Sequence, residues 1–235
     1  MGLEVASSPT SLDISEARCR IDLSQAVVWE GYRALKGLAP SSSAIGPAAT
    51  LARSWLSKHP WATGAGGTPQ SMGDLPLAHG RLLEAAFERH IASSLEQLIR
   101  GIRTQEHTSW SAGVEALLGA GPGLTPAGDD VLAGMVLTLQ SARELTIPAL
   151  PELLALIQRR AASQTTLYGY STLIAACLGH SPEVVIRALE ALFFMPAAVP
   201  DSLAALVRMG ATSGYDTLLG LVAGLDLMAR PARSG

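Results

Sequence analysis

The chain has 235 residues, of which 48% are hydrophobic and 5% aromatic, and its formal net charge is −3. This length can bury a large core, and the composition favours close-packed helices rich in Leu, Ala, Val and Ile. No cluster of Lys or Arg is present, which argues against a nucleic-acid partner, since neutralising phosphates needs clustered cations. Cys19 and Cys177 form no C-x-x-C motif and have apolar neighbours, which predicts buried, reduced thiols.

The first residues lack the basic start and apolar run of a signal peptide. The apolar runs after Asp130 and Asp216 are interrupted by Gln140 and Asp226, so neither reaches the roughly 18 residues of a membrane span. We therefore expect a cytoplasmic protein without a membrane partner.

In chain order, residues 1–23 are predicted to be a short β-rich segment and residues 24–235 a helical domain. The turn-punctuated stretch 3–23 predicts two or three small strands. Ser24 is expected to cap a helix with the sequence SQAVVWEGYRALKG, in which Val28, Tyr32 and Leu35 share one face.

The rest of the chain predicts a series of helices separated by Gly and Pro. In the string LGHSPEVV, Gly179 is expected to end one helix and Ser181 to cap the next. The fold class is therefore mainly α (α+β), with about nine to ten helices and a small N-terminal β element. Residues 59–80, with five glycines and three prolines, are expected to form a long loop. The helices after Ser24 are predicted over residues 47–57, 81–103, 110–118, 129–145, 151–162, 166–178, 182–194, 201–209 and 215–229.

A glycine-rich motif, GAGPGLTPAGDDVLAG at residues 119–134, has a weaker copy later in the chain. The pattern G-x-D-x-x-x-G runs from Gly128 to Gly134 and again from Gly214 to Gly220, each time followed by an apolar helical run. Each pattern places its aspartate, Asp130 or Asp216, in a first helical turn, where a negative charge suits the helix dipole. The second glycine allows another helix to approach closely.

Two such helix starts facing one another would create a pocket with backbone N–H groups, hydroxyls and carboxylates. Free amides bind anions, and carboxylates act as bases, orient a substrate amine or bind a divalent cation. We therefore name Asp129, Asp130 and Asp216 as candidate catalytic residues. No metal site is firmly indicated, although Asp129 and Asp130 are candidate Mg²⁺ ligands. First-turn capping by Asp216 and simple packing by the glycines are the structural alternative.

Other enzyme signatures are missing from the sequence. There is no G-K-[ST] of a P-loop and no G-x-S-x-G, and neither cysteine has a polar setting. A polar stretch at residues 164–171, QTTLYGYS, holds two threonines and a serine between apolar segments, which exceeds what one helix cap requires.

The strings GLTPAGDDVLAG and TSGYDTLLG, with the Thr/Ser stretch between them, resemble the AllH-type family, long catalogued as a domain of unknown function. The resemblance extends from about Ile21 to Leu225. It implies a subunit of the multi-subunit oxamate carbamoyltransferase of allantoin (purine) catabolism. The implied reaction is carbamoyl exchange between a ureido or oxamate-type anion and phosphate, giving carbamoyl phosphate. Pro122, Pro126 and the three aspartates match positions of the family motif. The other matching positions are the candidate substrate-binding residues Gly121, Gly123, Leu124, Thr125, Gly128, Thr166, Ser171, Ser213 and Gly214.

The chain departs from the family pattern in two places. Ala211 stands where relatives often have a histidine in G-H-[ST]-S-G-x-D, and the β-rich front is shorter than relatives often have. Three functions therefore stay open: a carbamoyltransferase subunit acting on a small anion with other subunits, a metal-dependent hydrolase on a helical scaffold, and a non-catalytic binding subunit. A homo-oligomer is also an open alternative.

Overall fold

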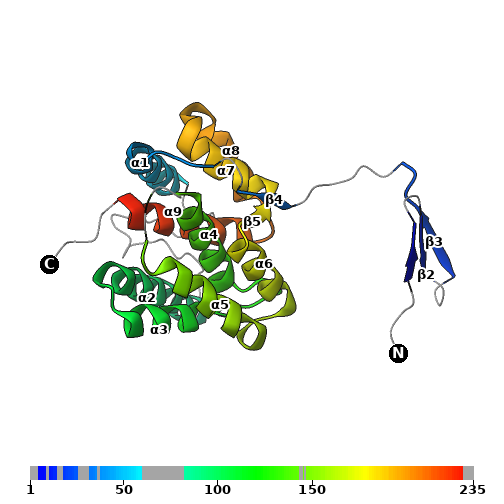
Figure 1. Ribbon diagram of the computed structural model, residues 1–235, viewed down its shortest axis with the longest axis horizontal. Coiled ribbons are helices and arrows are strands. Elements are labelled where there is room, and N and C mark those ends of the chain that lie inside the picture. The colour runs from blue at the N-terminus through cyan, green and yellow to red at the C-terminus, as the bar shows by residue number, and fades with distance from the viewer. Residues whose placement is uncertain are drawn as a thin grey trace. The chain divides into compact units, whose positions relative to one another are not determined.

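A computed structural model describes residues 5–8, 11–14, 18–25, 32–35, 38–59, 82–142, 145 and 147–229 of the protein. The chain forms two compact units, Met1–Gly31 and Tyr32–Gly235. The described part of the second unit is built largely of helices (Figure 1). The prediction of a mainly α fold with a small β element is thus confirmed.

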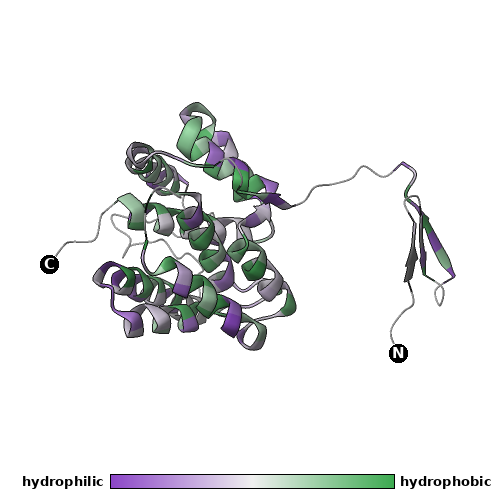
Figure 2. Cartoon of the chain, viewed as in Figure 1, coloured by the Kyte–Doolittle hydropathy of each residue, from purple (hydrophilic) through white to green (hydrophobic). Residues whose placement is uncertain are grey.

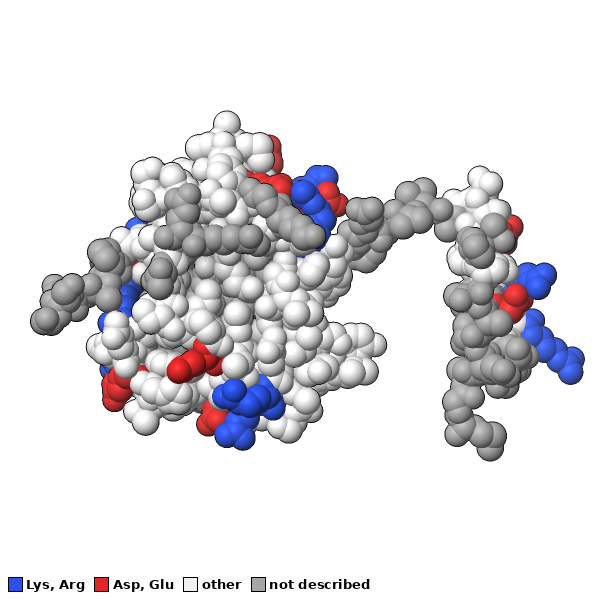
Figure 3. Space-filling view, in the orientation of Figure 1, with Lys and Arg blue, Asp and Glu red and all other residues white. Residues whose placement is uncertain are grey.

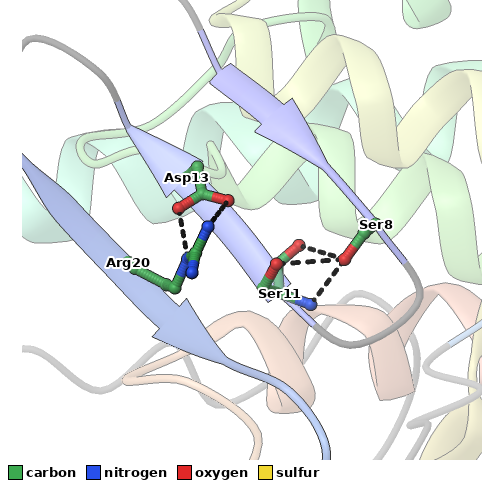
Figure 4. Close-up of polar contacts among 4 residues, drawn as sticks. All are labelled: Ser8, Ser11, Asp13 and Arg20. Carbon is green, nitrogen blue, oxygen red and sulfur yellow. Dashed lines mark hydrogen bonds and ion pairs between the residues drawn. The ribbon is translucent and has the colours of Figure 1, made fainter.

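The N-terminal unit is a three-stranded antiparallel sheet, in agreement with the predicted strands. Its strands are β1 (Val5–Ser7), β2 (Ser11–Ile14) and β3 (Cys19–Asp22), in the order β1-β2-β3. Asp13 on β2 faces Arg20 on β3, with 2.7 Å between Oδ1 and Nε (Figure 4). The hydrogen bond from Arg20 holds the pKa of Asp13 below its usual value.

The two cysteines differ in environment, so the prediction of two buried thiols is only half right. Cys177 is buried, and burial raises the pKa of its thiol to about 12. Cys19 is exposed because it lies on a strand whose described residues are all exposed. Both are free thiols.

A second, two-stranded sheet corrects the prediction of a helix that begins at Ser24. Strand β4 (Tyr32–Ala34) pairs antiparallel with β5 (His180–Pro182), and the following Leu35 donates its N–H to the Gly179 carbonyl at 2.8 Å. The helical spacing of Tyr32 and Leu35 is therefore misleading. Hydrogen bonds to a segment almost 150 residues away decide the local conformation, which a local pattern cannot reveal.

The predicted helices from residue 47 onward are confirmed, with ends that differ by a few residues. The prediction that Ser181 caps the next helix is wrong, because the residue before α7 is Pro182 and Ser181 is buried in β5. Most of the predicted loop 59–80 lies outside the described residues. The helices are α1 (Ser42–Lys58), α2 (Leu82–Thr104), α3 (His107–Leu117), α4 (Ala127–Ser141), α5 (Leu150–Gln164), α6 (Leu167–Cys177), α7 (Glu183–Phe194), α8 (Val199–Leu206) and α9 (Ser213–Ala229), with a 3-10 turn η2 (Pro196–Ala198) before α8.

Helices α4 and α9 pack against one another along their length at the centre of the second unit (Figures 1 and 2). A Cβ added to Gly134 would lie 2.2 Å from the Thr217 carbonyl oxygen, and one added to Gly220 would lie 2.0 Å from that of Val131. Further along, Gly224 faces Thr138. The residue numbers rise together on both helices, so the pair is parallel and both N-termini lie at the same end.

The charged residue that interrupts the apolar pattern of α9 has a structural role. Asp226 is buried and pairs with Arg53 of α1, while Arg103 of α2 donates to the Asp226 carbonyl at 3.2 Å. These two contacts of Asp226 connect α1, α2 and α9.

At the surface, side chains of opposite charge lie next to one another (Figure 3), as in the Arg187–Glu183 and Arg160–Glu115 pairs. No helix in the described part of the chain is long and apolar enough to cross a membrane.

Candidate functional site

The glycine-rich loop between α3 and α4 follows a path that requires glycine. Gly119, Gly121 and Gly123 have φ angles of +69°, +125° and +98°, a region that other residues rarely adopt. A Cβ on Gly119 would lie 2.0 Å from the Gln164 carbonyl oxygen, whereas one on Gly123 would meet nothing within 4 Å. Gly119 thus permits packing against the end of α5, and Gly123 has open space beside it.

Three helix N-termini converge on this loop, those of α4, α6 and α9. The Thr125 hydroxyl lies 2.8 Å from that of Ser213 at the start of α9. The Thr166 hydroxyl donates to the Leu124 carbonyl and also caps α6 by accepting the Gly169 N–H at 3.0 Å. Each N-terminus carries a partial positive charge, and Asp129, Asp130 and Asp216 occupy the first turns of α4 and α9, as predicted.

Asp129 links the loop, α4 and the start of α6. It is fully buried, its Oδ1 accepts the Gly119 N–H at 2.8 Å, and its Oδ2 accepts the Thr165 hydroxyl. Gly169 makes room for it, because a Cβ there would lie 2.2 Å from the Asp129 Oδ2. Burial raises the pKa of Asp129, and the two hydrogen bonds act in the opposite direction. With both oxygens accepting hydrogen bonds, Asp129 links the glycine-rich loop to the starts of α4 and α6.

Replacing Asp129 by asparagine is expected to lower the free energy of unfolding by about 2 kcal/mol, because a buried amide NH2 would face one of the two donors. Urea unfolding followed by circular dichroism measures the change. Thr165→Val, which removes only one neutral donor, should cost less, about 1 kcal/mol. Equal stability of Asp129→Asn and the parent protein would contradict a linking role for this carboxylate.

Asp130 differs from Asp129, because one of its carboxylate oxygens has no hydrogen-bond partner among the described residues. It is 3% exposed, and its Oδ2 is buried without a hydrogen-bond partner among the described residues. The pKa of Asp130 is raised to about 7, mainly because burial removes water from the carboxyl group. The negative charges of Asp216 and Asp129 raise this pKa further, whereas hydrogen bonds from the Ser213 and Thr125 hydroxyls lower it. A carboxyl that titrates near neutrality can exchange a proton with a substrate.

Asp216 lies at the edge of the site and is partly exposed. Its charge raises the pKa of Asp130 and also that of Tyr215, which reaches about 12 mainly through burial. The repeat thus brings Asp130 and Asp216 together, as the sequence predicts.

The backbone amides divide into two groups. Those of Gly128 and Gly214 donate at 2.9 Å to the carbonyls of Ala120 and Met209, so they are not the free anion-binding donors expected. Both glycines permit close packing instead: a Cβ would lie 2.0 Å from the Leu117 carbonyl oxygen in the first case and 1.9 Å from that of Leu206 in the second. By contrast, four loop amides donate to no backbone carbonyl within the described residues, namely those of Gly121, Gly123, Leu124 and Thr125.

The Thr/Ser stretch contributes unequally. Ser171 is exposed, and its hydroxyl donates to the Leu167 carbonyl of its own helix at 2.9 Å; no described contact joins it to the carboxylates. Two residues that the sequence reasoning did not select, Thr165 and Gly169, both meet Asp129. The paired threonines were a signal for the first of them, but a glycine inside a helix gave no indication of its partner.

No cluster of metal-binding side chains marks this site in the part of the chain described. No group of three or more His, Cys, Asp or Glu residues there is placed to hold a metal ion. A cavity of about 480 Å³ lies elsewhere, at the C-terminal ends of α4 and α6, where Gln140, Leu178 and His180 are among its lining residues. It includes none of the predicted site residues.

Comparison with known proteins gives one family. Residues 117–225 match the family described as Oxamate carbamoyltransferase subunit AllH, a shorter span than the expected Ile21 to Leu225. Neither the curated proteins nor the solved structures gave a match. Residues 117–225, which include the glycine-rich loop and the starts of α4, α6 and α9, are therefore similar to the AllH family.

Proposed function

We propose that the chain is a subunit of a carbamoyltransferase and that it binds a small ureido or oxamate-type anion at the three converging helix starts. The observation that carries the proposal is the Asp130 carboxyl, buried with an unpartnered Oδ2 and a pKa near 7. The family description names a carbamoyltransferase subunit, and the loop amides provide donors for an anion.

The proposed reaction needs a proton at one defined place. Phosphate attacks the terminal carbamoyl carbon of oxalurate, the C–N bond to the oxamate nitrogen breaks, and carbamoyl phosphate and oxamate result. The departing nitrogen must gain one proton, and the attacking phosphate, if it enters with its O–H, must lose one. Asp130 in its acid form donates the first and recovers the second, so atoms and charge balance over a cycle.

The other candidate residues have supporting parts in this proposal. The amides of Gly121, Gly123, Leu124 and Thr125 bind the carboxylate or phosphate oxygens. The hydroxyl pair of Thr125 and Ser213 orients the carbamoyl group beside Asp130. Catalysis then depends on positioning and on electrostatic stabilisation rather than on a covalent nucleophile.

A binding subunit without catalysis is the second candidate, because exposed Ala211 replaces the histidine that the family pattern places before α9. The metal-dependent hydrolase has less support, since no group of three or more His, Cys, Asp or Glu residues in the described part of the chain is placed to hold a metal ion.

Calorimetric titration of the chain with oxamate and oxalurate tests binding. Carbamoyl phosphate formation from oxalurate and phosphate, measured with the products of neighbouring genes added, tests turnover. We expect binding by the isolated chain and turnover in the complex. Binding without turnover in any combination selects the non-catalytic subunit. Absence of both contradicts the proposal.

A further inference from the structure

Three large apolar side chains are exposed next to the candidate site. Leu124, Leu167 and Tyr168 are 66%, 75% and 58% exposed, and we call them the apolar rim. Leu124 belongs to the glycine-rich loop, while Leu167 and Tyr168 are the first two residues of α6. Exposed apolar side chains grouped in this way mark interaction surfaces more often than single ones do.

The backbone that carries the apolar rim is held firmly in place. The Thr166 hydroxyl joins the Leu124 carbonyl to the capped start of α6, and Gly169, one residue beyond Tyr168, packs against Asp129. A rigid apolar surface loses little conformational entropy when a partner binds, which favours affinity. Leucine and tyrosine side chains on such a surface can anchor a protein interface.

The charge of the site indicates what a partner has to supply. Three carboxylates occupy the first turns of α4 and α9, and the proposed substrates are anions. Among the described residues, no Lys or Arg forms an ion pair with Asp129 or Asp130. Transfer to phosphate concentrates negative charge in the transition state, which enzymes stabilise with Arg, Lys or a metal ion.

We infer that another subunit of the same enzyme docks on the apolar rim and places a cationic side chain, Arg or Lys, over the helix starts. This inference rests on the proposed function, since the charge argument assumes an anionic substrate. The active site then lies at the interface between two different subunits. The chain alone binds the small anion, and the partner completes the stabilisation of the transition state.

The test is co-expression of the chain with candidate subunits taken from its genomic neighbourhood, followed by size-exclusion chromatography with light scattering. Leu167→Lys, at the start of α6, is expected to weaken assembly at least tenfold. Leu178→Lys is the matched control, because Leu178 is 63% exposed and lies just beyond the other end of the same helix. Hydrogen exchange of the complex is expected to show protection of residues 121–125 and 166–169.

The assembly experiments test docking on the apolar rim, and the binding experiments test the proposed function. Oxamate binding by the isolated Leu167→Lys chain shows that the variant is folded and that the anion site is intact. Assembly that is unaffected by Leu167→Lys, or is weakened equally by Leu178→Lys, would overturn the inference while leaving the proposed function in place. A dimer of the chain alone that Leu167→Lys dissociates would overturn it in favour of a second copy. Failure of every co-expressed subunit to assemble with the chain would also overturn it.

Discussion

Replacing Gly220 by alanine is expected to lower the free energy of unfolding by about 3 kcal/mol, because overpacking a close contact forces backbone shifts. The added Cβ would lie 2.0 Å from the Val131 carbonyl oxygen and 2.8 Å from the Met135 nitrogen. These are backbone atoms of α4 and cannot rotate away. Urea unfolding followed by circular dichroism at 222 nm, as a conventional helix signal, gives the measurement.

Gly46→Ala is the matched control for this change. Gly46 lies in α1, it is exposed, and a Cβ there would meet nothing within 4 Å. Alanine is the better helix former, but Pro47 follows directly and disfavours helical backbone at a preceding residue that carries a Cβ, so this variant should differ from the parent by no more than about 1 kcal/mol. If Gly220→Ala lost no more stability than Gly46→Ala, direct backbone contact between α4 and α9 would be wrong.

The contact between α4 and α9 explains why the G-x-D-x-x-x-G pattern occurs twice. Gly134 faces residues three and seven positions after Gly214, and Gly220 faces residues three and seven positions after Gly128. The two copies therefore pack with an approximate twofold relation. This arrangement sets the two positive helix ends side by side, next to the first-turn aspartates.

This part of the site could be predicted because the information is local. The spacing from Gly128 to Gly134, repeated at Gly214 to Gly220, indicates both the helix starts and a close approach between the helices. The flanking turns, with Gly and Pro at fixed positions, indicate where the helices begin and end. These patterns depend on residues within about ten positions of one another.

Other features depend on contacts that the sequence does not display. Strand β4 exists because Tyr32–Ala34 pairs with β5, although its apolar spacing is helical. Asp129 and Asp130 look alike in sequence, but consecutive helical residues point about 100° apart. Asp129 therefore meets Thr165 before α6, while Asp130 faces Ser213 at the start of α9. Only the packing of three helices distinguishes the structural carboxylate from the one that we propose to exchange a proton.

Replacing Asp130 by asparagine is expected to have opposite effects on activity and stability. The amide cannot exchange a proton, so carbamoyl transfer by the assembled enzyme should fall by about 10²-fold or more. The pKa of Asp130 rises from 3.8 in its usual state to about 7 in the fold. Between these values the folded chain keeps a proton that the unfolded chain has lost, so stability falls as pH rises through this window.

The parent protein has lost all of this unfolding free energy above pH 7, where Asp130 is ionised in both states. It has lost none of it below pH 3.8, where Asp130 is protonated in both states. The size of this loss is on the order of a few kcal/mol. Asp130→Asn removes this titration, so its stability relative to the parent should be higher at pH 8 than at pH 5, as measured by urea unfolding at both values. Asp201→Asn, which changes an exposed first-turn carboxylate of α8, should alter neither activity nor this difference. An Asp130→Asn variant that loses stability more at pH 8 than at pH 5 would show that the carboxylate is a stabilising anion, and the proton-transfer role would have to be assigned to another group.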